Sequence, residues 1–300
     1  MADNPLDRAL TEQRNLASER LDTLSILEVV DLMNAQDALV AAAVHAAREE
    51  IARAVEMVVA AFRAGGRLFY IGAGTSGRLG TLDAAECPPT FGTDPAQVQA
   101  VIAGGRDALV RAIEGAEDRA EDGAAALRER GFGPSDVLAG IAACGLTPFV
   151  RGGLEFARGL GAGTVFITCN PRLDGPPPAD VVIAVDAGPE VLTGSTRLKA
   201  GTATKLVLNT LTTAAMVRLG KCYGNLMVDL RATNHKLRIR SARILRQLCG
   251  LDDAAARQCL ADAGDVLKVA ILMARRGLGR DEAKALLAQH QGILRRALGE

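Results

Sequence analysis

The sequence predicts an α/β fold in which helices cover both faces of a parallel sheet of five strands. Short apolar runs, typical of buried parallel strands, recur at residues 67–71, 98–103, 136–142, 163–168 and 180–185. Helical patterns alternate with these runs, at residues 77–86, 106–129, 147–160 and 196–219. Hydrophobic residues make up 49% of the 300 residues, which is enough for a buried core. Such a sheet binds ligands at the carboxyl ends of its strands.

Helical segments also precede and follow the predicted sheet. Residues 26–33 and 36–64 have helical patterns, and Gly65-Gly66 ends the second of them. Beyond about residue 245, short helices are expected at residues 251–260, 266–275 and 281–288, with Asp252 in an N-cap context for the first of them. The expected organisation is therefore an N-terminal helical segment (1–60), a sheet domain (61–222), and a C-terminal linker with a small helical bundle (223–300).

The composition excludes several classes of protein. The 35 Lys and Arg residues balance 35 Asp and Glu residues, and the chain has seven Phe, two Tyr and no Trp, so nucleic acid is not an expected partner. The six cysteines form no CxxC pair, which predicts free thiols in a reducing compartment and no zinc site. The N-terminus lacks a signal-peptide pattern, and no apolar run is long enough to cross a membrane. We therefore expect a cytoplasmic protein.

A glycine-rich loop follows the first predicted strand. Gly72, Gly74 and Gly77 have the spacing GxGxxG between a strand and a helix, where backbone N–H groups point at a bound anion. The next strand ends without the acidic residue that a dinucleotide site requires for its ribose. Thr75 and Ser76 add hydroxyl donors, which suit a terminal phosphate. The loop therefore favours a sugar phosphate, with a dinucleotide and a plain tight turn as alternatives.

A second group of polar residues follows the last predicted strand. Ser195 is the expected N-cap of the helix that begins at Arg197. Thr196 and Lys199 supply more donors than a cap needs. Two helix N-termini at one sheet edge would form a pocket for a phosphorylated ligand, although capping alone is the alternative.

Acidic residues follow each of the first two strands. Pro88-Pro89 is expected to end the helix just after Glu86, and the macrodipole at a helix C-terminus favours the protonated form that a general acid needs. A solvated surface residue is the alternative for Glu86. The predicted helix 106–129 carries a run of further acids, from which the residues alone do not select a catalytic base: Glu114, Glu117, Asp118, Glu121 and Asp122.

Long stretches of the chain resemble the N-acetylmuramic acid 6-phosphate etherase family. The resemblance is carried by residues 11–15, 21–24, 72–92, 112–118, 194–203 and 224–230, and so covers nearly the whole chain. It implies a sugar-isomerase (SIS) domain in a three-layer αβα fold, a homodimer with sites near the subunit interface, and no cofactor or metal. The implied activity, in bacterial cell-wall recycling, cleaves the D-lactyl ether of N-acetylmuramic acid 6-phosphate with water.

The resemblance also implies roles for individual residues. It maps the two catalytic carboxylates onto Glu86, expected as the acid, and Glu117, expected as the base of an elimination that is followed by hydration. The residues expected to bind the substrate and its phosphate are Gly74, Thr75, Ser76, Gly77, Arg78, Thr147, Ser195, Thr196 and Lys199.

One segment departs from the family pattern. Cys144 and Leu146 stand where the family usually has Ser and Arg, so two polar contacts are missing, and a weaker enzyme or a different substrate is an open expectation. Two other functions remain as alternatives: a non-catalytic sugar-phosphate sensor similar to the glucokinase regulatory protein, and a sugar-phosphate isomerase of the same fold. The presence of both Glu86 and Glu117 argues against the sensor.

Overall fold

The computed structural model describes residues 8–173, 175–229 and 235–300. The chain forms two compact units. The first contains the residues up to Ala85 together with Ala96–Thr212, and the second contains Glu86–Pro95 and Thr213–Glu300. None of the helices in the described ranges is both long and apolar enough to cross a membrane.

A parallel sheet of five strands forms the centre of the first unit. Its strands are β1 (Leu68–Gly72), β2 (Val98–Ile102), β3 (Val137–Ile141), β4 (Gly163–Thr168) and β5 (Val181–Ala184). They lie in the order β2-β1-β3-β4-β5, and every neighbouring pair is parallel. The α/β fold and the five-stranded parallel sheet predicted from the sequence are therefore confirmed. The last residue of β1, Gly72, pairs with Ile102 of β2 and Ile141 of β3, so these strands end level with one another.

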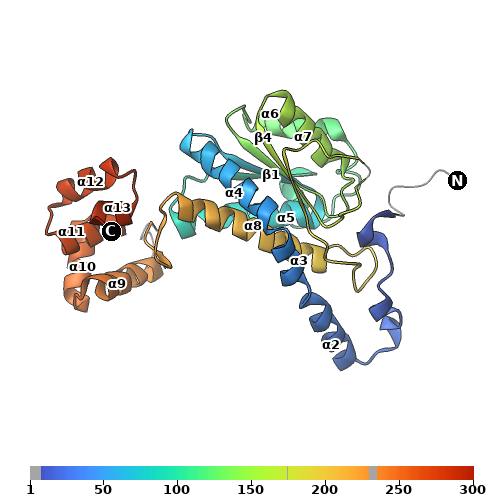
Figure 1. Cartoon of the computed structure of the whole chain (residues 1–300), viewed down its shortest axis with the longest axis horizontal. Helices are drawn as coiled ribbons and strands as arrows, with labels where there is room; N and C mark the ends of the chain where they lie inside the picture. Colours follow the sequence, from blue (N-terminus) through green and yellow to red (C-terminus); the bar gives the residue numbers. More distant parts are fainter. Residues whose placement is uncertain (1–7, 174, 230–234) are drawn as a thin grey trace. The chain divides into compact units, whose positions relative to one another are not determined.

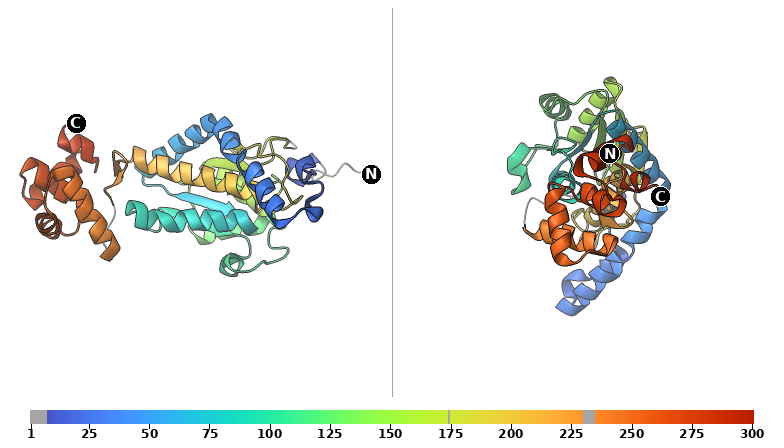
Figure 2. Two further views of the ribbon diagram at one scale, coloured as in Figure 1. Left: turned by 90° about the horizontal axis from the view of Figure 1, so that it is seen from below. Right: turned by 90° about the vertical axis from the view of Figure 1, so that its left-hand side faces the viewer.

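Helices cover both faces of this sheet (Figures 1 and 2). On one face lie α6 (Ala120–Glu129) and α7 (Pro148–Gly159); on the other lie α4 (Arg48–Arg63), α5 (Gly74–Phe91) and α8 (Lys199–Arg218). Phe69 and Ile71 of β1 belong to the buried core that includes residues of α6 and α7. Tyr70 lies between them in sequence and points to the other face, where its hydroxyl donates to Asp83 of α5 at 2.8 Å.

The N-terminal part of the first unit is divided into more, shorter helical elements than the sequence predicted. Three short 3₁₀ turns precede α2 (Ile26–Asp37), at Leu10–Glu12, Leu16–Ser18 and Leu21–Thr23. The helix α3 (Val40–Ala46) follows α2. The predicted break near residue 34 is wrong, because α2 continues through it from a capping box formed by Ser25 and Glu28. The single helix predicted over 36–64 is also wrong, since Ala47 has non-helical angles between α3 and α4.

Two further predictions about helix ends are wrong. The helix α5 does not stop at Pro88-Pro89; it continues to Phe91 and ends at Gly92, which has a φ of +63°. Glu86 is therefore not in the last turn of α5. The predicted helix 106–129 is divided into a 3₁₀ turn (Gly105–Leu109), a loop, and α6, because Gly115 in the loop has a left-handed φ of +69°.

The second unit contains the predicted C-terminal helical bundle. The expected short helices are present as α10 (Asp253–Asp262), α11 (Leu267–Arg276) and α12 (Arg280–Gln289). The predicted N-cap of α10 is confirmed, because the Ala255 N–H donates to the Asp252 carboxylate at 2.8 Å. The sequence analysis missed a hairpin of β6 (Cys222–Tyr223) with β7 (Leu226–Met227), and also α9 (His235–Cys249) and α13 (Leu294–Leu298).

Asp229 forms ion pairs that connect several segments of this bundle. Its carboxylate pairs with Lys221 at 2.6 Å and with the buried Lys268 at 3.0 Å. Lys268 also donates to the Gly292 carbonyl at 2.8 Å. The hairpin segment, α11 and the turn before α13 are thus held by one charged network.

The two helices α6 and α7 lie unusually close together. A Cβ atom on Gly152 of α7 would be 2.0 Å from the Ala120 carbonyl oxygen of α6. A Cβ atom on Gly123 of α6 would likewise be 2.0 Å from the Phe149 carbonyl oxygen. Glycine is therefore required at both positions, and the close approach fixes where each helix begins.

Substitution of Gly152 by Ala is expected to lower the free energy of unfolding by about 1–3 kcal/mol, because the methyl group would have to displace the backbone of α6. Gly159→Ala in the same helix is the matched control, since nothing lies within 4 Å of a Cβ at that position. Urea unfolding of both variants measures the difference. Equal midpoints for Gly152→Ala and Gly159→Ala would contradict the proposed close contact.

Candidate functional site

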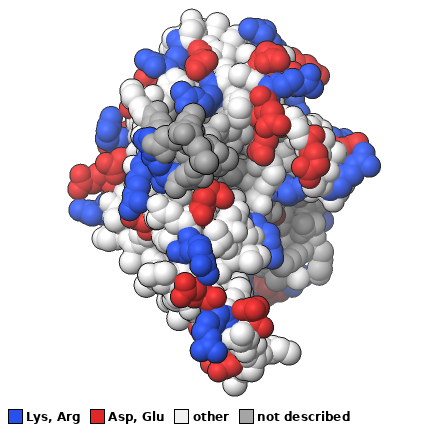
Figure 3. Space-filling model, turned by 90° about the vertical axis from the view of Figure 1, so that its right-hand side faces the viewer, with Lys and Arg blue, Asp and Glu red and all other residues white. Residues whose placement is uncertain are grey.

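The loops that follow the strands meet at one edge of the sheet. Because all five strands are parallel, α5, α7 and α8 begin at the edge where β1, β3 and β5 end. Figure 3 shows the side of the molecule on which α8 begins, where acidic and basic side chains are interspersed. The loops that carry the predicted site residues of the first unit therefore lie along this edge.

The glycine-rich loop presents the first turn of α5. The first backbone bond into the helix runs from the Gly77 N–H to the Ala73 carbonyl at 3.2 Å. The N–H groups of Gly74, Thr75 and Ser76 precede it and have no acceptor within the helix. Gly74 is exposed, and the two hydroxyl residues are half-buried. This turn has the donors that an anion site needs, as the glycine spacing predicted.

Arg78 points away from this turn. Its guanidinium donates to the Leu109 carbonyl at 3.3 Å and to the Arg111 carbonyl at 3.0 Å. The side chain thus holds the start of the loop between β2 and α6. The structure places Arg78 beneath that loop, where the sequence analysis expected a contact with substrate.

Glu117 lies in the same loop, three residues before α6. Its carbonyl accepts the Phe149 N–H at 3.0 Å, which fastens the loop to the first turn of α7. Its side chain is exposed at this edge. Partial burial of the carboxyl, together with the nearby negative charges of Asp118 and Glu114, raises the pKa of Glu117. A carboxylate with a raised pKa is a better proton acceptor than an ordinary one.

A cavity of about 250 Å³ adjoins the Glu117 loop. It is lined by Gly104, Ile113, Glu114, Gly115, Ala116, Arg119, Asp122 and Phe149. Two of these, Glu114 and Arg119, flank Glu117 in the sequence. The loop therefore borders free space next to the start of α7, since Phe149 of α7 also lines the cavity.

The loop after β3 carries Cys144 and Leu146, which the sequence analysis identified as departures from the expected pattern. Cys144 and Leu146 are half-buried, and the Cys144 carbonyl accepts a hydrogen bond from Asn170 at 3.0 Å. Burial raises the pKa of the Cys144 thiol, and the charges of Glu12 and Glu117 raise it further. Thr147 is the N-cap residue of α7, yet its hydroxyl does not cap the helix and is left for another partner.

The start of α8 differs from the prediction. The helix begins at Lys199, so Ser195 is not its N-cap. The cap is the fully buried Glu190, whose two carboxylate oxygens accept the N–H groups of Lys199 and Ala200, each at 2.9 Å. The first N–H groups of α8 are thus occupied by the protein itself. Ser195 and Thr196 lie half-buried in the turn before the helix.

Lys199 is buried in a network that the sequence did not reveal. Its ammonium group donates to the Gln36 side chain at 2.9 Å, and Asn15 donates to the same Gln36 oxygen at 2.8 Å. Asn15 also donates to the Pro189 carbonyl at 3.0 Å. Burial lowers the pKa of Lys199, an effect opposed by the charge of Glu190. The side chain therefore links α8 to the N-terminal segment.

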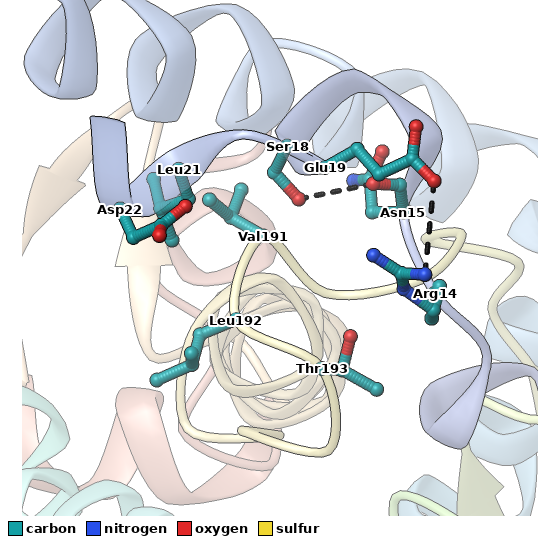
Figure 4. Close-up of a pocket in the computed structure, with 9 residues that line it drawn as sticks. All are labelled: Arg14, Asn15, Ser18, Glu19, Leu21, Asp22, Val191, Leu192 and Thr193. Carbon is teal, nitrogen blue, oxygen red and sulfur yellow. Dashed lines mark hydrogen bonds and ion pairs between the residues drawn. The ribbon is translucent and has the colours of Figure 1, made fainter. Parts of the chain in front are cut away.

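A second cavity lies beside the loop that leads to Ser195 (Figure 4). It has a volume of about 330 Å³ and is lined by Arg14, Asn15, Ser18, Glu19, Leu21, Asp22, Val191, Leu192 and Thr193. Arg14 pairs with Glu19 at 3.7 Å across one side of it. The N-terminal segment and the 191–193 loop thus line the same solvent-accessible cavity.

Two carboxylates on α5 differ sharply in their surroundings. Asp83 is buried and accepts hydrogen bonds from Tyr70 at 2.8 Å and from Asn209 of α8 at 2.7 Å. Burial raises the pKa of Asp83, and these hydrogen bonds oppose that rise. Glu86, which begins the second unit, is exposed. Leu82, one turn before Glu86, is also 54% exposed.

Several known proteins are similar to this chain. Residues 50–158 match the model of the glucokinase regulatory protein N-terminal SIS domain. An N-acetylmuramic acid 6-phosphate etherase of Synechococcus sp. strain CC9605 is 55% identical, over 96% of this chain and 92% of the relative. One of Rhodopirellula baltica is 50% identical over 98% of each chain. A solved structure from E. coli CFT073 in complex with A5P is 14% identical, covers 67% of this chain and 97% of its own, and gives a TM-score of 0.49.

Lys199→Met is expected to lower the free energy of unfolding by about 1–3 kcal/mol, because it leaves the half-buried Gln36 and the buried Glu190 without their cationic neighbour. Lys205→Met, at an exposed position of the same helix, is the matched control and should change stability little. Thermal unfolding at neutral pH compares the two. If Lys199→Met unfolds at the same temperature as Lys205→Met, the network does not stabilise the start of α8.

Proposed function

The chain belongs to the N-acetylmuramic acid 6-phosphate etherase family and is an enzyme, and from this we propose that it cleaves the D-lactyl ether of N-acetylmuramic acid 6-phosphate with water. The products are N-acetylglucosamine 6-phosphate and D-lactate. The observation that carries this proposal is the identity of 50–55% with etherases over nearly the full length of both chains. The anion-binding turn of α5 is consistent with a phosphorylated substrate.

The phosphate of the substrate binds at the first turn of α5 in this proposal. Gly74, Thr75 and Ser76 supply backbone N–H groups that have no acceptor within the helix. Thr75 and Ser76 also supply hydroxyl groups. The N-terminus of α8 contributes through the hydroxyls of Ser195 and Thr196 in the preceding turn, since Glu190 occupies its N–H groups. Phosphate binding therefore rests mainly on one helix N-terminus.

The chemistry is an elimination followed by a hydration. With the sugar ring open, the C1 aldehyde makes the C2 proton acidic, so a base can remove it. The C3–O bond then breaks, the departing lactate oxygen takes a proton from an acid, and a C2–C3 double bond forms. Water adds across this bond, with its oxygen bonding to C3 and a proton returning to C2. Each step removes one proton and delivers another, which two carboxyl groups of opposite protonation state can do.

We assign the base to Glu117 and the acid to Glu86. The raised pKa of Glu117 and its exposure at the sheet edge support the first assignment. The assignment of Glu86 rests on the membership of the etherase family, and its exposed side chain is open to a ligand. Arg78 has a positioning role in this scheme, because it holds the loop that carries the base.

The active form is proposed to be a cytoplasmic homodimer. The helix α2 has no buried residue, and Ile26, Leu27 and Val30 on it are 86%, 69% and 48% exposed. Leu82 on α5 is also largely exposed, one turn before Glu86. Apolar side chains left open in this way are typical of surfaces that a second copy covers.

A sugar-phosphate sensor is the second candidate function. It is favoured by the match of residues 50–158 to the glucokinase regulatory protein domain. A sensor would bind the sugar phosphate without releasing lactate. A sugar-phosphate isomerase would convert the sugar and also release no lactate, so an assay for D-lactate separates the etherase from both.

Glu86→Ala and Glu117→Ala are each expected to reduce kcat for D-lactate release by about 10²–10⁴-fold, because each removes a proton-transfer group. Glu121→Ala, an exposed acid on α6, is the control and should retain activity. The assay measures D-lactate from N-acetylmuramic acid 6-phosphate, with circular dichroism to show that each variant folds. Full turnover by either variant would refute the role given to that residue.

The pH dependence of the reaction tests the base separately. Glu117 must be ionised to act, so kcat/KM is expected to rise with pH through its raised pKa. Glu114→Gln removes a neighbouring negative charge, which lowers the pKa of Glu117 and moves the rising part of the kcat/KM profile (its acidic limb) to lower pH. Glu121→Gln should leave this acidic limb at the same pH. A limb that stays fixed or moves to higher pH in Glu114→Gln would mean that another group is the base.

A further inference from the structure

The N-terminal segment is a fixed part of the sheet edge. Ala9, Leu10 and Thr11 are buried, with at most 6% of each residue exposed. The Leu10 N–H donates to the Asn170 side chain after β4 at 3.3 Å. The Thr11 carbonyl accepts the Gly194 N–H at 3.3 Å, in the loop that leads to Ser195. The segment therefore bridges two of the loops that form the candidate site.

Glu12 projects from this segment among the same loops. A Cβ atom on Gly194 would be 3.0 Å from the Oε2 atom of Glu12, so the carboxylate lies directly against that glycine. Its charge also acts on Cys144 in the loop after β3, together with the charge of Glu117. Asn170 connects these parts, since it bonds both the Leu10 N–H and the Cys144 carbonyl. Glu12 thus lies between the loops after β3, β4 and β5.

The carboxylate of Glu12 has unused acceptor capacity. The donor found for it among the described residues is the Thr11 hydroxyl, at the long distance of 3.4 Å, and no described cation pairs with it. An ionised carboxylate can accept about four hydrogen bonds, and partial burial without them is unfavourable. The nearby Glu19 differs, because it is more exposed and pairs with Arg14. Glu12 therefore has the properties of a group that receives donors from a ligand.

The ligand group must be a hydrogen-bond donor without negative charge. A phosphate would be repelled by Glu12, and its place is at the first turn of α5. That turn lies beside α8, since a Cβ on Gly201 would be 3.6 Å from the Thr75 methyl group. A ligand with its phosphate at α5 and its other end toward Gly194 would present sugar hydroxyls to Glu12.

We propose that Glu12 binds the sugar part of the phosphorylated substrate, by accepting hydrogen bonds from its hydroxyl groups. The proposal rests on the proposed function only in taking the ligand to be a sugar phosphate. It adds a binding residue from the N-terminal segment, which precedes the sheet in the sequence and belongs to the same unit. Glu12 holds the sugar and transfers no proton.

Isothermal titration calorimetry with two probes tests this binding role. In Glu12→Gln, the Kd for N-acetylglucosamine 6-phosphate is expected to increase about 10- to 100-fold, the usual effect of losing hydrogen bonds to a charged group. The Kd for inorganic phosphate should stay unchanged or fall slightly, because a negative charge has been removed. Glu19→Gln is the matched control in the same segment and should change neither Kd. Thermal unfolding of each variant is measured alongside.

Three results would overturn the proposal. The first is an unchanged Kd of Glu12→Gln for the sugar phosphate. The second is an equal loss of affinity for sugar phosphate and inorganic phosphate, or a large fall in unfolding temperature, each of which means that Glu12 supports the loops only. The third is absence of sugar-phosphate binding by the unsubstituted protein. Failure of the etherase assignment gives a different result: the protein binds the sugar phosphate normally and releases no D-lactate.

Discussion

The parallel alignment of the five strands is the constraint on which the candidate site depends. It places the start of α5, the loop that ends at Thr147, and the Ser195–Thr196 turn on one edge, although they are far apart in the sequence. The close approach of α6 and α7 through glycine then fixes the loop of Glu117 against the start of α7. Without the parallel order, these residues would have no common edge.

The two helix N-termini at this edge have different electrostatic roles. The first N–H groups of α5 have no acceptor within the helix, whereas the buried Glu190 occupies those of α8. A carboxylate at a helix N-terminus is favourable in the helix dipole, and burial strengthens the interaction. Lys199 balances this charge from inside the protein and also bonds to Gln36 of α2. Glu190 and Lys199 therefore have structural roles, because their contacts hold the start of α8 and the turn of Ser195 and Thr196 that precedes it.

Local sequence signals predicted the sheet, the glycine-rich turn and the cap at Asp252, because each depends on residues within one short segment. They failed where tertiary contacts decide the structure. Pro88-Pro89 is a strong stop signal, yet α5 continues to Gly92. Glu190 caps a helix that begins nine residues later, and Lys199 pairs with a residue 163 positions away, so neither contact has a local pattern. The roles of Glu86 and Glu117 came from family resemblance, since residue types alone did not distinguish Glu117 from its acidic neighbours.

The central claim is that an acidic and a basic carboxyl group cleave the ether by elimination and hydration. Turnover of N-acetylmuramic acid 6-phosphate in water enriched with heavy oxygen (¹⁸O) tests it most directly, with mass spectrometry of both products. Elimination and hydration place the label on C3 of N-acetylglucosamine 6-phosphate and leave D-lactate unlabelled. Label in the hydroxyl group of lactate would mean attack of water on the lactyl carbon, and would contradict the account.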